Sequence, residues 1–295
     1  MPRQSDLMIR AVTADGAIRA FAINSTNLCE RARRIQESWP TATAAMGRVL
    51  SAAVMMAGTI KEGERISIRV DGDGPLGGIF AQATPDGKVR GYVHHPQVHL
   101  PLRNGKLDVG GATGKGTLYV VRDLGMQEPY VGRVDLQTGE IGDDIAYYFL
   151  TSDQQPSAVG LGVLVETDNS VAAAGGYIIQ PLPGAPAEVI DHLEHNIRHA
   201  PRPSDLILSL RDPQKVLGVL LDGFDWQVID SLAPRFFCGC TRSKSHTALR
   251  ALSVEDLDEM VVACEPVHVT CDFCGRSYEF PIDALIKIRE GKSEP

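Results

Sequence analysis

The chain has 295 residues, of which 43% are hydrophobic and 22% charged, a composition typical of a globular protein and a length sufficient for one large and one smaller domain or for two of middling size. Its formal net charge of -8 argues against a broad nucleic-acid-binding face. Residues Met1–Val12 lack the apolar run of a secretory signal, and the most apolar predicted helix, Pro40–Ile60, contains Arg48 and several polar residues. We therefore expect a cytoplasmic protein with no nucleic-acid or membrane partner, whose thiols are normally reduced.

The N-terminal part of the chain predicts a mixture of strands and helices. Two strands, Ile9–Val12 and Ile18–Ile23, are joined by an Asp-Gly turn and followed by helices over Asn27–Ser38 and Pro40–Ile60. Further strands are predicted at Ile66–Val70, Gly78–Thr84, Val89–His94, Gly116–Arg122, Tyr130–Leu136, Val159–Glu166 and Val171–Gln180, with a helix within Gly139–Pro156. We expect an α+β fold whose large N-terminal domain, residues 1–180, contains antiparallel sheets and buried helices.

A Pro-rich stretch, Pro181–Pro186, is the best candidate for a boundary, because successive prolines interrupt both helices and strand ladders. From Ala187 to Asp230 the sequence is largely helical and amphipathic. Four apolar residues there fall at helical spacing: Val189, Ile190, Leu193 and Ile197. We expect residues 181–230 to form a helical linker and residues 231–295 a small cysteine-bearing domain.

Four of the six cysteines form two close pairs, Cys238 with Cys240 and Cys271 with Cys274. In a reducing compartment this spacing indicates metal or redox chemistry rather than a structural disulfide framework. The second pair lies between two strand-like segments, and Gly275 allows the backbone to turn closely around a metal. A short helix is predicted between the pairs, starting with a capping box at Ser253 and Asp256 and covering Val254–Val262.

Four thiolates can complete a tetrahedral zinc site, and metal binding would supply much of the folding energy of a tail with few apolar residues. Iron or an iron–sulfur cluster is the other option. Oxidation of Cys238 and Cys240 would close a very small, strained ring that is easily reduced again, and Cys271 and Cys274 could also pair locally. The site could thus be a redox switch, although spacing alone favours a static zinc site.

Seven stretches resemble, in order and spacing, the redox-regulated 33 kDa heat-shock chaperones (33 kDa chaperonin). They are PTATAAMGRVLSAAVMM, GDGPLG, VRGYV, GKGTLYVVRDLG, AAGGYIIQPLPGA, FFCGC and VTCDFCG. The resemblance implies an ATP-independent chaperone and not an enzyme. It implies one Zn²⁺ per chain in a reduced, inactive state, held by Cys238, Cys240, Cys271 and Cys274.

The same resemblance implies what oxidation does. Disulfides Cys238–Cys240 and Cys271–Cys274 form, zinc leaves, and the tail and linker unfold. The protein then forms a homodimer and binds unfolding proteins through newly exposed apolar surface. The resemblance thus assigns client binding and dimerisation to residues 1–180 and the zinc-binding redox switch to residues 231–295.

Two cysteines lie outside the four-thiol pattern. Cys29, within the first predicted helix, fits a small buried residue. Cys264 lies seven positions before Cys271 and is either inert or a wrong disulfide partner after zinc is lost. No catalytic residue is predicted.

Other functions are weaker hypotheses. A thiol–disulfide oxidoreductase usually places its cysteine pair at the start of a helix, whereas a strand-like segment follows Cys274. A zinc-ribbon module for nucleic acid conflicts with the acidic charge balance. The G-x-G-x-x-G match at Gly72–Gly77 predicts a hairpin turn because a strand follows it. Five histidines are interpreted as not binding metal: His192, His195, His199, His246 and His268.

Overall fold

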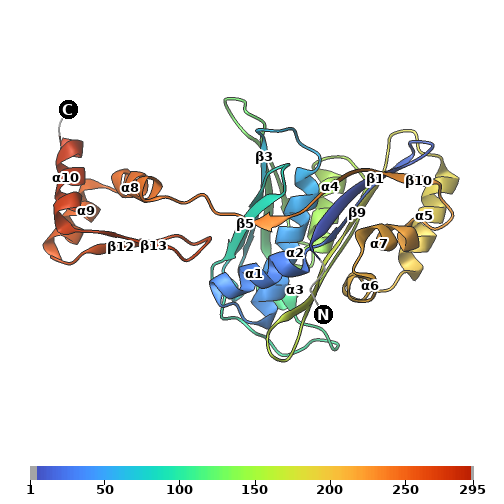
Figure 1. Ribbon diagram of the computed structural model, residues 1–295, viewed down its shortest axis with the longest axis horizontal. Helices are drawn as coiled ribbons and strands as arrows, with labels where there is room; N and C mark the ends of the chain where they lie inside the picture. Colours follow the sequence, from blue (N-terminus) through green and yellow to red (C-terminus); the bar gives the residue numbers. More distant parts are fainter. Residues whose placement is uncertain (1–4, 294–295) are drawn as a thin grey trace. The chain divides into compact units, whose positions relative to one another are not determined.

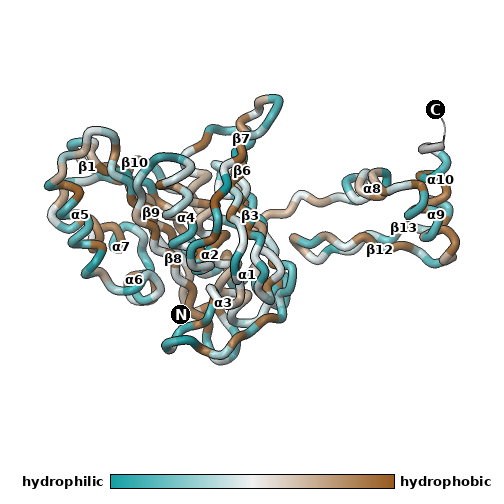
Figure 2. Tube along the Cα trace, turned by 180° about the vertical axis from the view of Figure 1, so that it is seen from behind, coloured by the Kyte–Doolittle hydropathy of each residue, from teal (hydrophilic) through white to brown (hydrophobic). Residues whose placement is uncertain are grey.

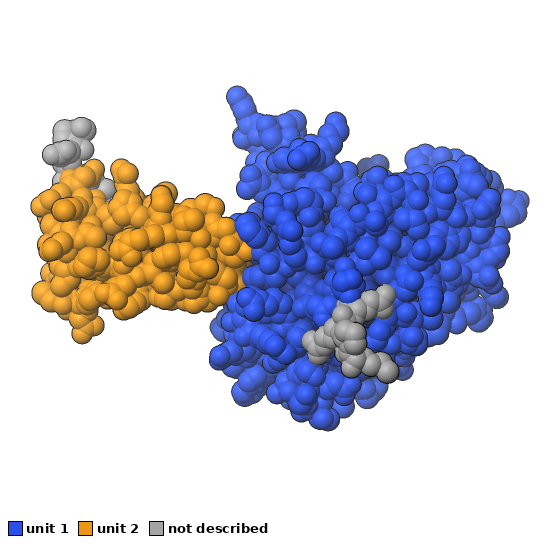
Figure 3. All heavy atoms as spheres, in the orientation of Figure 1, with its two compact units in different colours: residues 1–237 blue, residues 238–295 orange. Residues whose placement is uncertain are grey.

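The structure is a computed structural model that describes residues 5–293. The predicted N-terminal and C-terminal domains also include residues 1–4 and 294–295, which lie outside the described residues. The chain forms two compact units, Met1–Phe237 and Cys238–Pro295 (Figure 3). The predicted α+β class, with antiparallel sheets and buried helices, is confirmed. Within residues 5–293, no helix is both long enough and apolar enough to cross a membrane.

Two sheets form the framework of the first unit (Figure 1). The five-stranded sheet is antiparallel throughout, in the order β10 (Trp226–Leu232), β1 (Leu7–Thr13), β2 (Ile18–Asn24), β9 (Val171–Pro181), β8 (Ala158–Val165). The six-stranded sheet has the order β11 (Arg235–Phe236), β5 (Lys88–Val93), β4 (Ile79–Ala83), β3 (Arg65–Gly72), β6 (Gly116–Asp123), β7 (Tyr130–Asp135). Only the β11–β5 pairing in this sheet is parallel.

Helix α2 (Pro40–Ala57) forms the centre of this unit. Every residue of α2 except Pro40 and Arg48 is buried, as expected for a helix that is apolar on all sides. It contacts strands of both sheets, and α1 (Thr26–Gln36) packs beside it (Figure 1). The sequence correctly predicted this buried helix.

Three helices cover the other face of the five-stranded sheet: α5 (Ala187–His199), α6 (Pro203–Leu210) and α7 (Pro213–Leu220). Strand β2 shows why the sheet is covered on both sides. Its Phe21 and Ile23 join the core around α2, while Ile18, Ala20 and Ala22 join the core under α5–α7. Hydrophobic and hydrophilic stretches alternate along α5 (Figure 2), which agrees with its predicted amphipathic pattern.

Two sequence interpretations differ from the structure. Residues 226–230, predicted as helical, belong to strand β10, whose side chains are mostly exposed. The strand forms because its backbone pairs with β1, and the side-chain pattern of the sequence does not indicate this pairing. The prolines of Pro181–Pro186 do not separate the compact units, because α5–α7 pack on the sheet and the first unit continues to Phe237. The predicted division of the chain into an N-terminal domain, a helical linker and a cysteine-bearing domain, with boundaries at residues 180 and 230, remains a prediction.

The second unit contains a two-stranded hairpin and three helices. The predicted helix is confirmed as α9 (Val254–Val262), with the predicted capping box, and the predicted strands as β12 (Val267–Thr270) and β13 (Ser277–Phe280). Helices α8 (Arg242–Ala251) and α10 (Ile282–Ser293) complete it. Its hydrophobic core has five buried residues: Leu249, Leu257, Phe280, Leu285 and Ile288.

Candidate metal centre

The structure brings the four paired cysteines together. Cys238 and Cys240 lie in the segment that leads into α8, and Cys271 and Cys274 in the turn between β12 and β13. Their Sγ atoms all lie within 4.8 Å of one another. In the part of the chain that the structure describes, this is the one group of three or more His, Cys, Asp or Glu residues close enough to share a metal ion.

Main-chain hydrogen bonds shape the turn that presents Cys271 and Cys274. The carbonyl of Cys271 accepts hydrogen bonds from the amides of Cys274, at 3.3 Å, and Gly275, at 2.8 Å. The amide of Cys271 donates to the carbonyl of Arg276 at 3.0 Å. Gly275 has a φ of 68°, a left-handed conformation that favours glycine. The turn is therefore specified locally, as the sequence predicted.

The first turn of α8 holds the other cysteine segment. Lys244 Nζ donates to the carbonyl of Gly239, the residue between Cys238 and Cys240, at 2.7 Å. The hydroxyl of Thr241 accepts a hydrogen bond from the amide of Lys244 at 3.3 Å and caps the helix. Helix α8 thus limits the movement of the Cys-x-Cys segment.

The electrostatics of the cluster favour a cation. Burial raises the pKa of Cys238 and raises that of Cys274 to about 12. For Cys240 burial acts in the same direction, but hydrogen bonds from Tyr278 and from the neighbouring thiols lower the pKa to about 7. Four thiolates this close would repel one another strongly. A divalent metal offsets that repulsion and keeps the sulfurs ionised.

The sulfur positions fit a tetrahedral metal site. Zn–S bonds of about 2.3 Å place neighbouring sulfurs of a tetrahedron about 3.8 Å apart. Cys238 Sγ lies 3.7 Å from Cys271 Sγ, and Cys240 Sγ lies 3.3 Å from Cys274 Sγ. The donor set of four soft thiolates suits zinc and is also compatible with iron. These residues could hold one metal ion.

The remaining cysteines lie elsewhere. Cys29 is buried in α1, in the first unit. Cys264 is exposed and lies before β12, whereas Cys271 follows that strand. The four-residue strand alone spans about 13 Å. Neither thiol is a member of the metal-binding group.

The five histidines are also outside the group. His192 stacks on Phe224 with ring centroids 4.6 Å apart, and the rings of His195 and His199 lie 4.2 Å apart. In the second unit, His246 lies near Phe280 and His268 is an exposed residue of β12. That these histidines do not bind metal remains a prediction.

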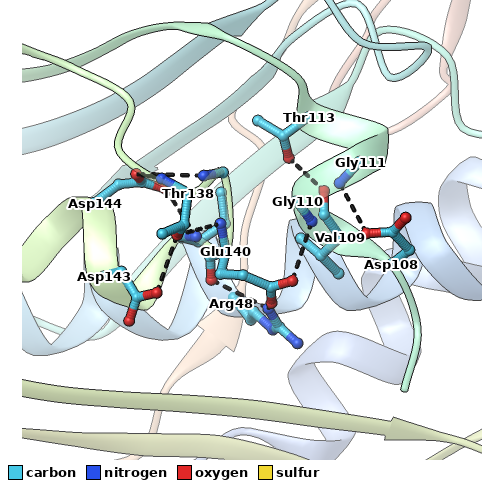
Figure 4. Close-up of polar contacts among 12 residues, drawn as sticks. Arg48, Asp108, Val109, Gly110, Gly111, Thr113, Thr138, Glu140, Asp143 and Asp144 are labelled. Carbon is cyan, nitrogen blue, oxygen red and sulfur yellow. Dashed lines mark hydrogen bonds and ion pairs between the residues drawn. The ribbon is translucent and has the colours of Figure 1, made fainter. Parts of the chain in front are cut away.

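The first unit also contains a polar cluster around Glu140 and Asp144 (Figure 4). Glu140 accepts hydrogen bonds from Arg48 Nη1, at 2.5 Å, and from the amide of Gly110, at 3.3 Å, while Asp108 caps α3 (Val109–Thr113). The carboxylate of Asp144, in α4 (Gly142–Thr151), accepts from four backbone amides: Gln137, Thr138, Gly139 and Ile141. These carboxylates are occupied by the protein's own donors, so we interpret the cluster as structural.

Sequence reasoning missed two side chains that support the metal centre. Lys244 contacts the Cys-x-Cys segment, and the hydroxyl of Tyr278 donates to Cys240 Sγ at 3.4 Å. Strand alternation places Tyr278 on the same face as the buried Phe280. That alternation is the signal that could have identified Tyr278.

Comparison with known proteins gives a consistent family. The model of the Hsp33 protein family matches residues 6–281. The 33 kDa chaperonin of Desulforamulus reducens is 45% identical over 96% of this chain and 97% of its own length. That of Agathobacter rectalis is 43% identical over 97% and 100%.

A solved structure agrees with these relatives. The crystal structure of the 33 kDa chaperonin (heat shock protein 33 homolog) of Thermotoga maritima has a TM-score of 0.91 and 33% identity, covering 99% of this chain and 100% of that one. The similarity thus extends over both compact units, including the segments that bring the four cysteines together. The chain belongs to the Hsp33 family.

Proposed function

We propose that this protein is a redox-regulated, ATP-independent chaperone whose reduced, inactive form binds one Zn²⁺ through Cys238, Cys240, Cys271 and Cys274. The observation that supports this most directly is the convergence of four sulfurs within 4.8 Å in a unit whose core, among the residues that the structure describes, has five buried hydrophobic side chains. Bound zinc would supply a cationic cross-link between thiolates. A unit with so small a core depends on such a cross-link for its fold.

Oxidation removes that cross-link. Two thiolates transfer two electrons to one hydrogen peroxide: an S–S bond forms, the O–O bond breaks and two hydroxide ions leave. We propose the pairs Cys238–Cys240 and Cys271–Cys274. Once the sulfurs are joined they no longer serve as thiolate ligands, and the second unit loses most of what orders it.

The chain between the units offers a route by which this loss reaches the first unit. Residues Arg235–Phe237, directly before Cys238, are held to the edge of the six-stranded sheet by backbone bonds to Gly87 and Val89. Strand β10 lies just upstream and pairs with β1. Helices α5–α7 precede it and cover an apolar sheet face that includes Ile9 and Ile18.

We propose that this covered face supplies the client-binding surface. If the segment from α5 to β11 detaches, the apolar side chains beneath α5–α7 become exposed. Apolar contact is non-directional and recognises unfolded chains regardless of their sequence. The proposed partners are therefore unfolding proteins and, in the oxidised state, a second copy of this chain; the proposed location is the cytoplasm.

One experiment tests this function. Aggregation of a heat-denatured client is followed by light scattering with the reduced and with the peroxide-oxidised protein, while a chromogenic chelator reports zinc release. We expect suppression by the oxidised form alone, with about one zinc released per chain. Equal activity of the two forms would refute the switch. Catalytic reduction of insulin disulfides would instead favour the oxidoreductase, whose pair is here followed by a strand, β13.

A further inference from the structure

The hydroxyl of Tyr278 connects the hairpin to the other cysteine segment. It donates a hydrogen bond to Cys240 Sγ at 3.4 Å, across 38 positions of sequence. Tyr278 belongs to β13 and comes four residues after Cys274, so its hydroxyl links the β12–β13 hairpin to the segment that contains Cys238 and Cys240. Tyr278 therefore contacts a sulfur of the candidate metal centre without being a metal ligand itself.

The position of this hydroxyl is fixed by the small core. Tyr278 pairs with Val269 across the hairpin, and both pack against the core of the second unit. Phe280, on the same face of β13, is 2% exposed, and the guanidinium of Arg242 lies 4.5 Å from the centroid of its ring. The donor is therefore carried by a packed strand, and its direction does not depend on a mobile loop.

The hydrogen bond has a defined chemical effect on the sulfur. A donor to a thiolate withdraws electron density, which lowers the reactivity of the sulfur toward electrophilic oxidants. Donors around ligand atoms also orient the ligands and tune the metal. Cys238 and Cys274 accept hydrogen bonds from backbone amides, which are part of the two turns. The Tyr278 contact is different because one substitution deletes it and leaves the turns in place.

We propose that Tyr278 is a positioning residue that sets the oxidation threshold of the switch by protecting Cys240. The inference rests on the proposed function, since it requires a metal at the four cysteines. With the hydroxyl in place, Cys240 is held in the site and is less nucleophilic. Without the hydroxyl, its sulfur is richer in electrons, and two-electron oxidation by peroxide begins at lower oxidant concentration.

The test uses the full-length protein and Tyr278→Phe, which keeps the ring and its packing. We expect peroxide-driven zinc release from this variant to be faster, on the order of tenfold. In the cobalt-substituted protein, the thiolate-to-cobalt charge-transfer band is expected to shift to longer wavelength, because an electron leaves the unprotected sulfur more easily. Thr270→Val is the matched control: it removes a hairpin hydroxyl that donates to the hydroxyl of Ser277, at 3.3 Å, instead of to a sulfur.

A second variant works in the opposite direction and keeps the side chain intact. 3-Fluorotyrosine at position 278 is a stronger hydrogen-bond donor, so zinc release is expected to be slower than in the native protein and the cobalt band to shift to shorter wavelength. Unchanged release rates and spectra in both variants would overturn the inference while leaving the switch standing. Failure of the native protein to bind zinc or cobalt would overturn the proposed function as well.

Discussion

The Sγ atoms of Cys240 and Cys274 lie 3.3 Å apart, although 34 positions separate the two residues in the chain. The contact of 3.7 Å between Cys238 and Cys271 also joins the two motifs. These short sulfur contacts of the folded site run between the motifs, while the disulfides proposed for the oxidised state lie within them. A disulfide map distinguishes these two patterns.

We expect peroxide to produce Cys238–Cys240 and Cys271–Cys274 as the main disulfides. Oxidation of one ligand weakens the hold on the metal, and as the unit loosens, the shortest loops close with the smallest loss of chain entropy. Trypsin cleaves after Arg242, so local disulfides leave the motifs on separate peptides in non-reducing mass spectrometry. A peptide linking Cys240 to Cys274 as the main product would show that the native contacts determine the pairing instead.

Fragmentation of the same peptides in tandem mass spectrometry tests the role of Cys264, because residues 251–276 stay on one tryptic peptide that also contains Cys271 and Cys274. This thiol is exposed, and β12 separates it from the four-sulfur group in the folded unit. Oxidised peptides are compared for the native protein and Cys264→Ser. A bridge containing Cys264 would identify it as a wrong partner, and its absence would end that hypothesis.

Removing one ligand should unfold the second unit. Cys271→Ser deletes a sulfur and the metal cross-link, and a core of five buried residues does not replace zinc-binding energies of about 10–16 kcal/mol. We expect less than one zinc per chain and lower helical circular dichroism, because α8, α9 and α10 depend on the site. Cys264→Ser is the matched control and should retain one zinc and native helicity. A folded, metal-free Cys271→Ser protein would contradict the proposed dependence on metal.

The four-cysteine cluster was largely predictable because the determinants of its two motifs are local. Two short cysteine motifs, a glycine at the turn and flanking strands define the site within a few residues on either side. Helix α2 was equally predictable, since a segment made mostly of apolar and small residues favours burial. Helix α10 was missed although its signal was present: Ile282, Leu285 and Ile288 recur every three residues, and two of them are buried.

Other features depend on contacts that no local pattern encodes. Strand β10 exists because its backbone pairs with β1, some 215 positions earlier in the chain; Val228, for example, lies opposite Ala11. The bond from Tyr278 to Cys240 requires both the hairpin register and the placement of the Cys-x-Cys segment. The carboxylate of Asp144 was not singled out, because its donors are main-chain amides and carry no side-chain signature.

The Asp144 carboxylate should be essential for the stability of the first unit. It is fully buried and accepts hydrogen bonds from four amides of the loop that leads into α4. Asp144→Ala leaves these donors unpaired, at an expected cost of about 3–5 kcal/mol in the free energy of unfolding. Urea denaturation followed by tryptophan fluorescence measures it, because Trp39 and Trp226 both lie in the first unit.

The neighbouring acid provides the control for this experiment. Asp143 is exposed and accepts a hydrogen bond from the hydroxyl of Thr138 at 3.0 Å. Asp143→Ala should change the free energy of unfolding by about 0.5 kcal/mol or less. Similar losses in the two variants would mean that the amide bonds of Asp144 are not the cause.

Glu30 should make the first unit sensitive to acid. Hydrogen bonds from Arg33, assisted by the amide of Val171, lower the pKa of this 3%-exposed carboxyl from 4.5 to about 2. A lowered pKa stabilises the fold at pH values above 4.5, and this contribution is lost as the pH falls toward 2. It amounts to about 3 kcal/mol. Glu30→Gln should therefore be less stable at pH 7 and lose less stability between pH 5 and 3, whereas Glu62→Gln, at an exposed position, should behave like the native protein.

Cys29 should make the first unit less stable at alkaline pH, whereas Glu30 makes it less stable at acid pH. Burial raises the pKa of its thiol from 9.0 to about 12, and Gly47 packs so closely that a Cβ there would lie 3.1 Å from the sulfur. The unfolded chain ionises this thiol above pH 9 while the folded protein keeps it neutral, so stability falls as the pH rises from 9 toward 12, by about 1.4 kcal/mol per pH unit. Cys29→Ala removes this slope, and comparison of the two proteins in urea at pH 8 and 10 cancels the effects of other titrating groups. Native Cys29 should also resist iodoacetamide at pH 8; parallel pH profiles, together with rapid alkylation, would show that the thiol is accessible and ionises in the folded state.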